Sequence, residues 1–443
     1  MRLSKAFIRS AAYERRFLAK NPWDLAMVVW IPLATVLLVW WIFSQTQITD
    51  LPIGVVDQDN GPIANTLVRY LEASPELSIY QQYHSPADVE AAILQRDVYA
   101  VVVIPENFSS NISSSKPAPV ILQVNAQYGT HSGIIQTSVQ AVIGTLSAGI
   151  EIQRMVKQGM ASSQAAINYS PIAIQRTSLF NTINNYQQFL ASTVIPALLH
   201  ILAMVIGATT IGRELRDKQL GHWSRFIDTG TPDLPDLKST SDSNQYNEHS
   251  KSATDAQHEL SSVPNIKPTK PIADVRKSSL AVLFAGLLGK YFWPILAYSI
   301  WSALALWLAT PQQGVAIESL IVTYISLVLL MMLSFWLGAV FTLGSFSLRM
   351  GLSATGFISV PSYAFAGVTY PYIAITDSAK YWADALPLTH YLKLHIAQLQ
   401  MQAPVAASLP IVYGLLLATI IALILMVLLT KRALSHPERW GAR

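Results

Sequence analysis

Residues that could do chemistry are sparse in this chain, and none has the spacing of a catalytic site. The segment Phe284–Tyr291 comes closest to a phosphate-binding loop, but it lacks the first glycine and the final hydroxyl of G-x-x-x-x-G-K-[ST]. The histidines are scattered rather than paired as metal ligands, as at His131, His200, His390 and His395. The chain has no cysteine, so it has no thiolate ligand and no disulfide. We therefore expect no enzymatic activity, bound cofactor or metal.

A different kind of chemistry is indicated by the stretch Ile211–Phe226, where a long apolar segment ends in mixed charge and two aromatic residues. A short charged helix here is suited to dock into a groove on a partner and to carry that partner's motion into a membrane. The residues that we predict to make this contact are Arg213, Glu214, Leu215, Arg216, Lys218, Trp223 and Phe226.

The composition places these residues in a membrane protein. Hydrophobic residues make up 51% of the 443 residues and charged residues 13%, about half the charged fraction of an ordinary soluble domain. A membrane-crossing helix needs about 20 apolar residues, and six intervals without Asp, Glu, Lys or Arg satisfy this length. The intervals are residues 25–49, 177–212, 291–317, 319–348, 350–376 and 394–430.

The basic residues predict the orientation of these spans. With six spans, most of the 30 Lys and Arg residues lie before residue 25, between residues 213 and 290, or after residue 430, all on the side of the two termini. Because basic residues favour the cytoplasmic side, we expect both termini in the cytoplasm, and a bacterial inner membrane as the location. The net charge of +4 then reflects topology and predicts no nucleic-acid partner.

Residues 50–188 change character and predict an α/β domain outside the membrane. Apolar strands at Pro52–Asp57, Val98–Ile104 and Val120–Val124 alternate with helical segments, of which Ile63–Leu71 is one. A helix at residues 131–160 is free of charge over much of its length. Its polar side chains and its apolar spacing of three and four favour a helix packed on one side in a water-soluble domain.

The fold class predicted is a polytopic α-helical membrane protein with six transmembrane helices and an α/β extracytoplasmic domain. An amphipathic helix is expected to lie on the inner leaflet at residues 1–24, and a disordered, polar cytoplasmic insert at 228–278. Leu280–Lys290 is expected to be interfacial, with Lys290 reaching the headgroups. The predicted boundaries are 1–24 interface helix, 25–49 first span, 50–188 α/β domain, 189–212 second span, 213–227 coupling helix, 228–278 insert, 279–430 interfacial segment, spans three to six and an outer re-entrant segment, and 431–443 cytoplasmic tail.

Charge is almost absent inside the spans, which argues against an ion-coupled carrier, because proton relays need carboxylates there. His200 is either a functional group or a neutral histidine bonded to a neighbouring helix. Small residues permit close helix approach and are candidates for the wall of a translocation path, although ordinary packing explains them equally well. The path candidates are His200, Ala203, Gly207, Gly351, Gly356 and Pro361.

Four features of the chain together resemble the ABC-2 type exporter permeases, in the six-span branch with a large periplasmic domain between spans one and two. They are the amphipathic N-terminus, the pair Leu51–Asp57 and Ile104–Phe108, the exit of span two at Gly212–Asp217, and the late segments Phe365–Pro371 and Leu386–Leu392. The family pattern continues with Gly-Thr after span two, where this chain has Lys218-Gln219.

The resemblance implies a permease dimer, formed with a second copy or a paralogue, bound to two separate ABC ATPase subunits that carry ATP and Mg. Residues 214–226 would be the coupling helix, and the substrate would be amphipathic or hydrophobic. A periplasmic adaptor and an outer-membrane channel often accompany this branch, and membrane lipids surround it. The alternative from another class is an envelope receptor or scaffold whose outer domain binds a partner; a co-purifying ATPase would separate the two.

Overall fold

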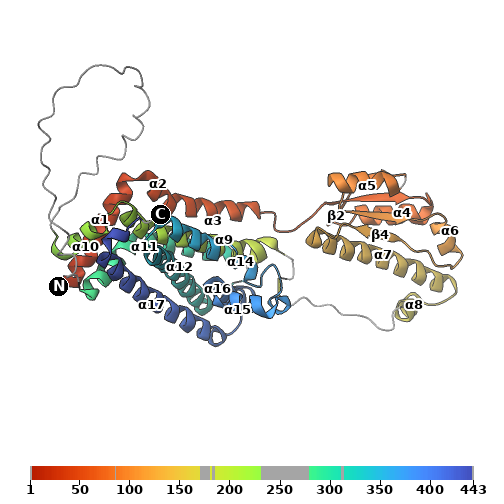
Figure 1. Cartoon of the computed structure of the whole chain (residues 1–443). Coiled ribbons are helices and arrows are strands. Elements are labelled where there is room, and N and C mark those ends of the chain that lie inside the picture. The colour runs from red at the N-terminus through yellow and green to blue at the C-terminus, as the bar shows by residue number, and fades with distance from the viewer. Residues whose placement is uncertain are drawn as a thin grey trace, which may run out of the picture. The chain divides into compact units, whose positions relative to one another are not determined.

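The structure is a computed structural model that describes residues 2–84, 86–169, 180–181, 185–230, 279–310 and 314–441. The chain divides into a helical unit, Met1–Ser44 with Gln187–Arg443, and an α/β unit, Gln45–Tyr186 (Figure 1). The predicted insert at 228–278 lies outside the described residues from residue 231 onward.

The α/β unit is built on a four-stranded sheet in the order β2-β1-β3-β4. Strand β1 pairs in parallel with β2 and β3, and β4 pairs antiparallel with β3. The sequence did not predict β2, because most of its residues are polar and only one is buried, so it lacks an apolar strand pattern. The elements are β1 Leu51–Asp57, α4 Pro62–Glu72, β2 Leu77–Tyr83, α5 Pro86–Gln95, β3 Ala100–Ile104, α6 Phe108–Ser113, β4 Ile121–Val124, α7 Gly129–Lys157 and α8 Ser162–Tyr169.

Both faces of the two central strands are buried, which explains their continuous apolar runs. Successive side chains of a strand point to opposite faces, so each strand contributes to two cores. The core under α4 and α7 contains Ile53, Val55, Leu67, Leu71, Val102, Ile104, Ile135 and Val139. The core under α5 contains Val56, Val89, Val98, Val101 and Val103.

Helix α7 is long and apolar enough to cross a membrane by length and composition. It nevertheless packs on the sheet of the α/β unit through Ile135, Val139 and Leu146. The structure therefore agrees with the sequence-based interpretation of this segment as one side of a folded domain.

The helical unit contains the other five helices that satisfy the length and apolarity of a membrane span among the described residues. They are Pro22–Ile42, Gln187–Arg216, Leu280–Ala309, Ile317–Ser345 and Val405–Ser435. Within them lie α2 Pro22–Leu25, a π-turn at Ala26–Trp30, α3 Ile31–Ile42, a π-turn at Gln187–Ala191, α9 Ser192–Arg216, α11 Leu280–Ala309, α12 Ile317–Ser345 and α17 Val405–Ser435.

The predicted fifth span is not one continuous helix. Helix α13 covers Leu348–Ser359 and ends before Pro361, and the short α14 covers Ser362–Phe365. Proline lacks the N–H that would continue a helix, which accounts for the break. The segment still follows the length of α9: Leu348 packs against Gly212, and the Tyr363 hydroxyl lies 3.0 Å from Thr193 Oγ1. Residues 193 and 212 are about 28 Å apart along a helix.

The ends of α12 and α17 show that this broken segment is a crossing. Gly441 N donates to Phe346 O at 3.0 Å, and the Arg432 guanidinium lies over the Phe346 ring, so both helices end at the same side of the unit. Because α17 must begin on the opposite side, the residues between α12 and α17 cross the unit once. After α13 and α14, the connection to α17 is made by α15 Asp377–Ala385, α16 Pro387–His395 and a π-turn at Ile396–Gln400, and α16 packs among α9, α12 and α17. The helical unit therefore has six crossings among its described residues, of which five are continuous helices and one is interrupted.

Helices α9 and α12 approach each other closely at small residues. A Cβ at Gly207 would overlap the Phe335 carbonyl oxygen, and a Cβ at Gly338 would overlap the Met204 carbonyl oxygen. The Tyr291 hydroxyl of α11 donates to Gly207 O at 2.7 Å, so a third helix is hydrogen-bonded at the same point.

We predict that Gly207→Ala lowers the thermal unfolding midpoint of the purified protein, because the added methyl would force α9 and α12 apart. Overpacking of this kind costs about 1–3 kcal/mol. Gly356→Ala on α13 is the matched control, since nothing lies within 4 Å of its Cβ position, and it is expected to leave the midpoint unchanged or raise it. Equal midpoints for the two variants would contradict the assigned packing.

Candidate functional site

The N-terminal helix α1, Arg2–Lys20, buries a stripe that its hydrophobic pattern did not predict. Its buried residues are Ala6, Ser10, Glu14 and Leu18, spaced four apart and therefore on one face. This face packs along α11 and α10. Helix α1 is thus packed against the other helices of its unit. The Phe7 carbonyl oxygen lies so close to Gly289 of α11 that a side chain there would overlap it.

Glu14 is the centre of a cluster of buried charges. Its carboxylate accepts hydrogen bonds from the Arg213 guanidinium of α9, and its Oε2 lies 3.4 Å from Lys290 Nζ of α11. Lys290 Nζ also donates to Glu214 Oε1 at 2.7 Å. These four residues, Glu14, Arg213, Glu214 and Lys290, are called the charge cluster below. Their side chains are between 0% and 8% exposed, and Asp24 adds a longer contact of 3.7 Å to Arg213.

Charges so buried persist only because they are balanced. Two carboxylates face two cations, and each ion has a hydrogen-bonded partner of opposite sign. An isolated ion in a low-dielectric interior would cost several kcal/mol. The cluster therefore favours one arrangement of α1, α9 and α11.

Aromatic rings enclose the charge cluster. The Arg213 guanidinium lies 3.7 Å from the centre of the Phe17 ring, and Lys290 Nζ lies 4.9 Å from that of Tyr13 and 5.5 Å from that of Trp223. Burial, with the neighbouring Glu214 carboxylate, raises the pKa of Tyr13, so its phenol stays neutral. Trp223 Nε1 donates to Ser10 Oγ at 3.1 Å, which joins α10 to the same network.

The predicted coupling helix at 213–227 is two elements. Helix α9 continues to Arg216, and α10 covers Leu220–Thr229 after a turn in which Lys218 has a left-handed backbone (φ 56°). Helix α9 can extend past its first charges because Arg213 and Glu214 find partners in the interior. Helix α10 ends at Gly230, which also adopts the left-handed conformation (φ 78°) that commonly ends helices.

Arg9 of α1 completes the end of α10. Its Nη1 donates to the carbonyl oxygens of Ile227 at 3.2 Å and Asp228 at 2.9 Å. A cation at the C-terminus of a helix satisfies free carbonyls and complements the helix dipole.

The structure divides the predicted coupling residues into two groups. Arg213, Glu214, Leu215 and Trp223 are buried within the helical unit, and their part in coupling to a partner stays a prediction. Phe226 is half-buried, with its ring centre 6.1 Å from that of Tyr13. Arg216 and Lys218 are exposed in the turn. We use the name α10 ridge for five exposed residues at the end of α9, in the turn and on α10: Arg216, Asp217, Lys218, His222 and Arg225.

Lys290 does not lie where the sequence predicted. Helix α11 runs unbroken from Leu280 to Ala309, so Leu280–Lys290 is no separate interfacial segment, and Lys290 is fully buried rather than at the headgroups. A signal for it was present, since Lys290 is the one charge in a 30-residue apolar helix. Glu14 is likewise the one acid in the basic helix α1.

Most of the path candidates lie at contacts between packed helices. Ala203 and Gly207 are buried, and Gly351 lies against Thr342 of α12. His200 Nδ1 lies 2.6 Å from Ser334 Oγ of α12. Gly356 has no close neighbour, and Pro361 marks the break after α13. Their role in a translocation path stays a prediction.

We predict that Lys290→Met strongly destabilises the protein, because Glu214 would be left as an unpaired buried carboxylate. Losing one partner of a buried ion pair costs about 3–5 kcal/mol. The double variant Lys290→Met with Glu214→Gln is expected to recover much of the thermal unfolding midpoint. Lys431→Met is the control, since Lys431 is exposed on α17. If Lys290→Met and the control melt alike, the charge cluster does not hold the helices.

Comparison with known families shows that residues 22–223 match the family described as ABC-2 family transporter protein. The match begins at α2, covers the α/β unit and α9, and ends within α10 at the charge cluster. No curated protein and no solved structure matches the chain.

Proposed function

We propose that this chain, which matches the ABC-2 family transporter proteins over residues 22–223, is the membrane permease subunit of an ATP-driven exporter. It would move an amphipathic or hydrophobic substrate out of the cytoplasm or the inner membrane. The ATP and Mg would be bound by a separate ABC ATPase that docks on this chain.

The observation that carries the proposal is the way α10 is held. Its buried face, with Leu220, Trp223 and Ile227, packs on α1 and α11. Its exposed face contributes to the α10 ridge together with the preceding turn. An element held on one side and free on the other is suited to receive a partner. Because Trp223 reaches Ser10 and Glu214 reaches Lys290, a push on the ridge would be passed to three helices.

The transmitted motion would act where the helices are in contact. Helix α9 continues from the charge cluster into the Gly207 contact with α12 and runs beside the broken crossing formed by α13 and α14. A displacement of α9 would therefore change its packing on both neighbours. We propose that these contacts shift when the ATPase closes, which opens a path outward between two permease subunits.

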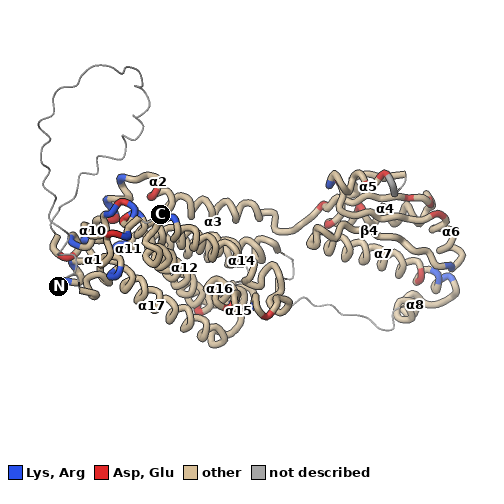
Figure 2. The backbone as a smooth tube through the Cα atoms, viewed as in Figure 1, with Lys and Arg blue, Asp and Glu red and all other residues tan. Residues whose placement is uncertain are grey.

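The distribution of charge supports the proposed orientation. Figure 2 shows Lys, Arg, Asp and Glu concentrated at the end of the helical unit where α1 and α10 lie. By the positive-inside tendency, this end and both termini would face the cytoplasm of a bacterial cell. The α/β unit would then be periplasmic, where an adaptor and an outer-membrane channel could join the transporter.

We predict that reversing the charge of the α10 ridge, by Lys218→Glu with Arg225→Glu, removes an ABC ATPase from the purified complex. At least a tenfold loss of the co-purifying ATPase and of ATP hydrolysis is expected, because both side chains are exposed and their charges would repel a complementary surface. The measurement is affinity purification from native membranes, with identification of the partner by its nucleotide-binding motif.

The matched control is Lys380→Glu with Lys393→Glu, on α15 and α16 at the opposite end of the helical unit (Figure 1). This variant should retain the ATPase. Variants at Glu214 or Trp223 would not separate docking from folding, because both side chains are buried. A purified chain that carries no ATPase before any substitution, but retains a periplasmic partner, would favour the receptor or scaffold alternative.

A further inference from the structure

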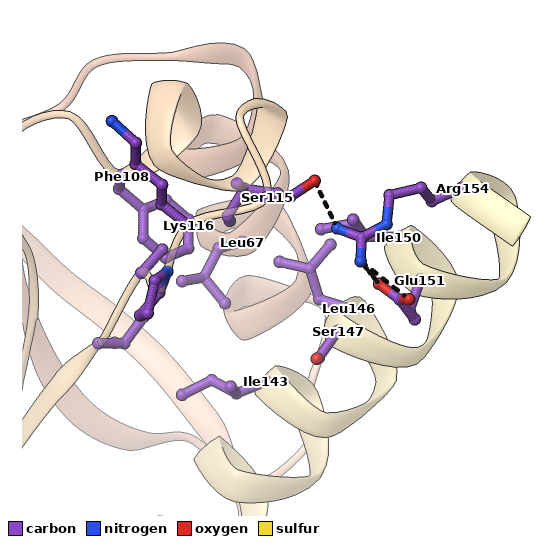
Figure 3. A pocket seen from close by; sticks show the side chains of 14 residues that line it. Leu67, Phe108, Ser115, Lys116, Ile143, Leu146, Ser147, Ile150, Glu151 and Arg154 are labelled. Atoms are coloured by element: carbon purple, nitrogen blue, oxygen red, sulfur yellow. Dashed lines mark hydrogen bonds and ion pairs between the residues drawn. The ribbon is translucent and has the colours of Figure 1, made fainter. Parts of the chain in front are cut away.

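The α/β unit contains a cavity of about 410 Å³ beside α7 (Figure 3). Its floor is formed by Leu67 of α4 and Phe108 and Ile112 of α6, and its wall by Ile143, Leu146 and Ile150 of α7. The volume lies within the range of about 300–1,000 Å³ typical of small-molecule sites.

One end of the cavity carries charge. Arg154 Nη1 donates to Ser115 Oγ at 2.8 Å, and its Nη2 donates to Glu151 Oε1 at 3.1 Å (Figure 3). These bonds hold the guanidinium at the junction of α7 with the segment after α6. Lys116 also lines the cavity, but its side chain lies beside Phe108 and away from Arg154 (Figure 3). The Arg154 guanidinium keeps further N–H donors that an anionic group could accept.

The cavity is elongated along α7. Its lining residues on that helix run from Ile143 to Arg154 with the spacing of one helix face. The eleven residue steps from Ile143 to Arg154 correspond to about 16 Å along the helix axis. The apolar side chains lie from Ile143 to Ile150, and the charged ones follow at Glu151 and Arg154. The shape and this gradient match a single chain with one polar end.

We propose that the α/β unit binds a single-chain anionic amphiphile, such as a fatty carboxylate, in this cavity. Its aliphatic tail lies between Phe108 and Ile143, and its anionic head lies near Arg154. The half-buried Ile143 and Ile150 side chains offer apolar surface that the tail contacts. The site is independent of the ATPase partner, so the proposal stands or fails separately from the proposed function.

The test is photolabelling of the full-length protein in phosphatidylcholine nanodiscs with dodecanoate that carries a diazirine at its tail. The label is expected on peptides from residues 108–120 and 143–154. Unlabelled dodecanoate should displace it at a concentration at least tenfold lower than dodecyltrimethylammonium does. Ile143→Trp, which fills the cavity, should reduce this labelling at least fivefold. Thr145→Trp, exposed on the same helix, is the matched control and should not.

A second variant keeps the test decisive if Ile143→Trp does not fold. Arg154→Glu changes an exposed side chain and should abolish the preference for the carboxylate over the ammonium. Labelling confined to the membrane helices, equal labelling of the Ile143→Trp and Thr145→Trp proteins, or equal displacement by the two amphiphiles would overturn the proposal.

Discussion

The ion pairs among Glu14, Arg213, Glu214 and Lys290 are the constraint on which one end of the helical unit depends, the end where α1 and α10 lie. These charges lie where water does not reach them, so each must have its partner or the local structure cannot persist. The requirement positions α1 beside α11, lets α9 continue past its first charged residues, and fixes the turn that leads into α10.

Once the charge cluster is formed, α10 has a defined buried side and a defined free side. Trp223 belongs to the buried side because its indole N–H donates to Ser10, and Arg9 closes the C-terminus of the same helix. The aromatic residues therefore hold α10 in place, whereas the polar residues of the ridge remain available for contact. This division is consistent with an element that must accept a force without being detached.

The helices beyond the cluster combine close packing with one discontinuity. Gly207 and Gly338 bring α9 and α12 into backbone contact, which gives a firm pair. Beside this pair, the crossing by α13 and α14 is broken before Pro361. The unit thus places an interrupted crossing next to a closely packed pair.

Much of this organisation could be predicted from the sequence, because it depends on local patterns. Length and apolarity indicated the continuous spans, and the apolar runs ending at Asp57 and Ile104 indicated two strands of the sheet. The polar spacing of residues 131–160 distinguished α7 from a membrane span. The glycine positions also indicated close helix packing. These properties belong to residues that are neighbours along the chain.

Only the tertiary structure decided the fate of the individual charges. Lys290 and Glu14 are 276 residues apart, and no local pattern states that they meet. A lysine in an apolar helix can reach the headgroups or bind a buried carboxylate, and the choice depends on which partner the fold brings near it. Strand β2 was missed for the same reason, since a largely polar segment becomes a strand by pairing with β1. Apolarity is a property of the residue itself, whereas the satisfaction of a polar group is a property of its surroundings.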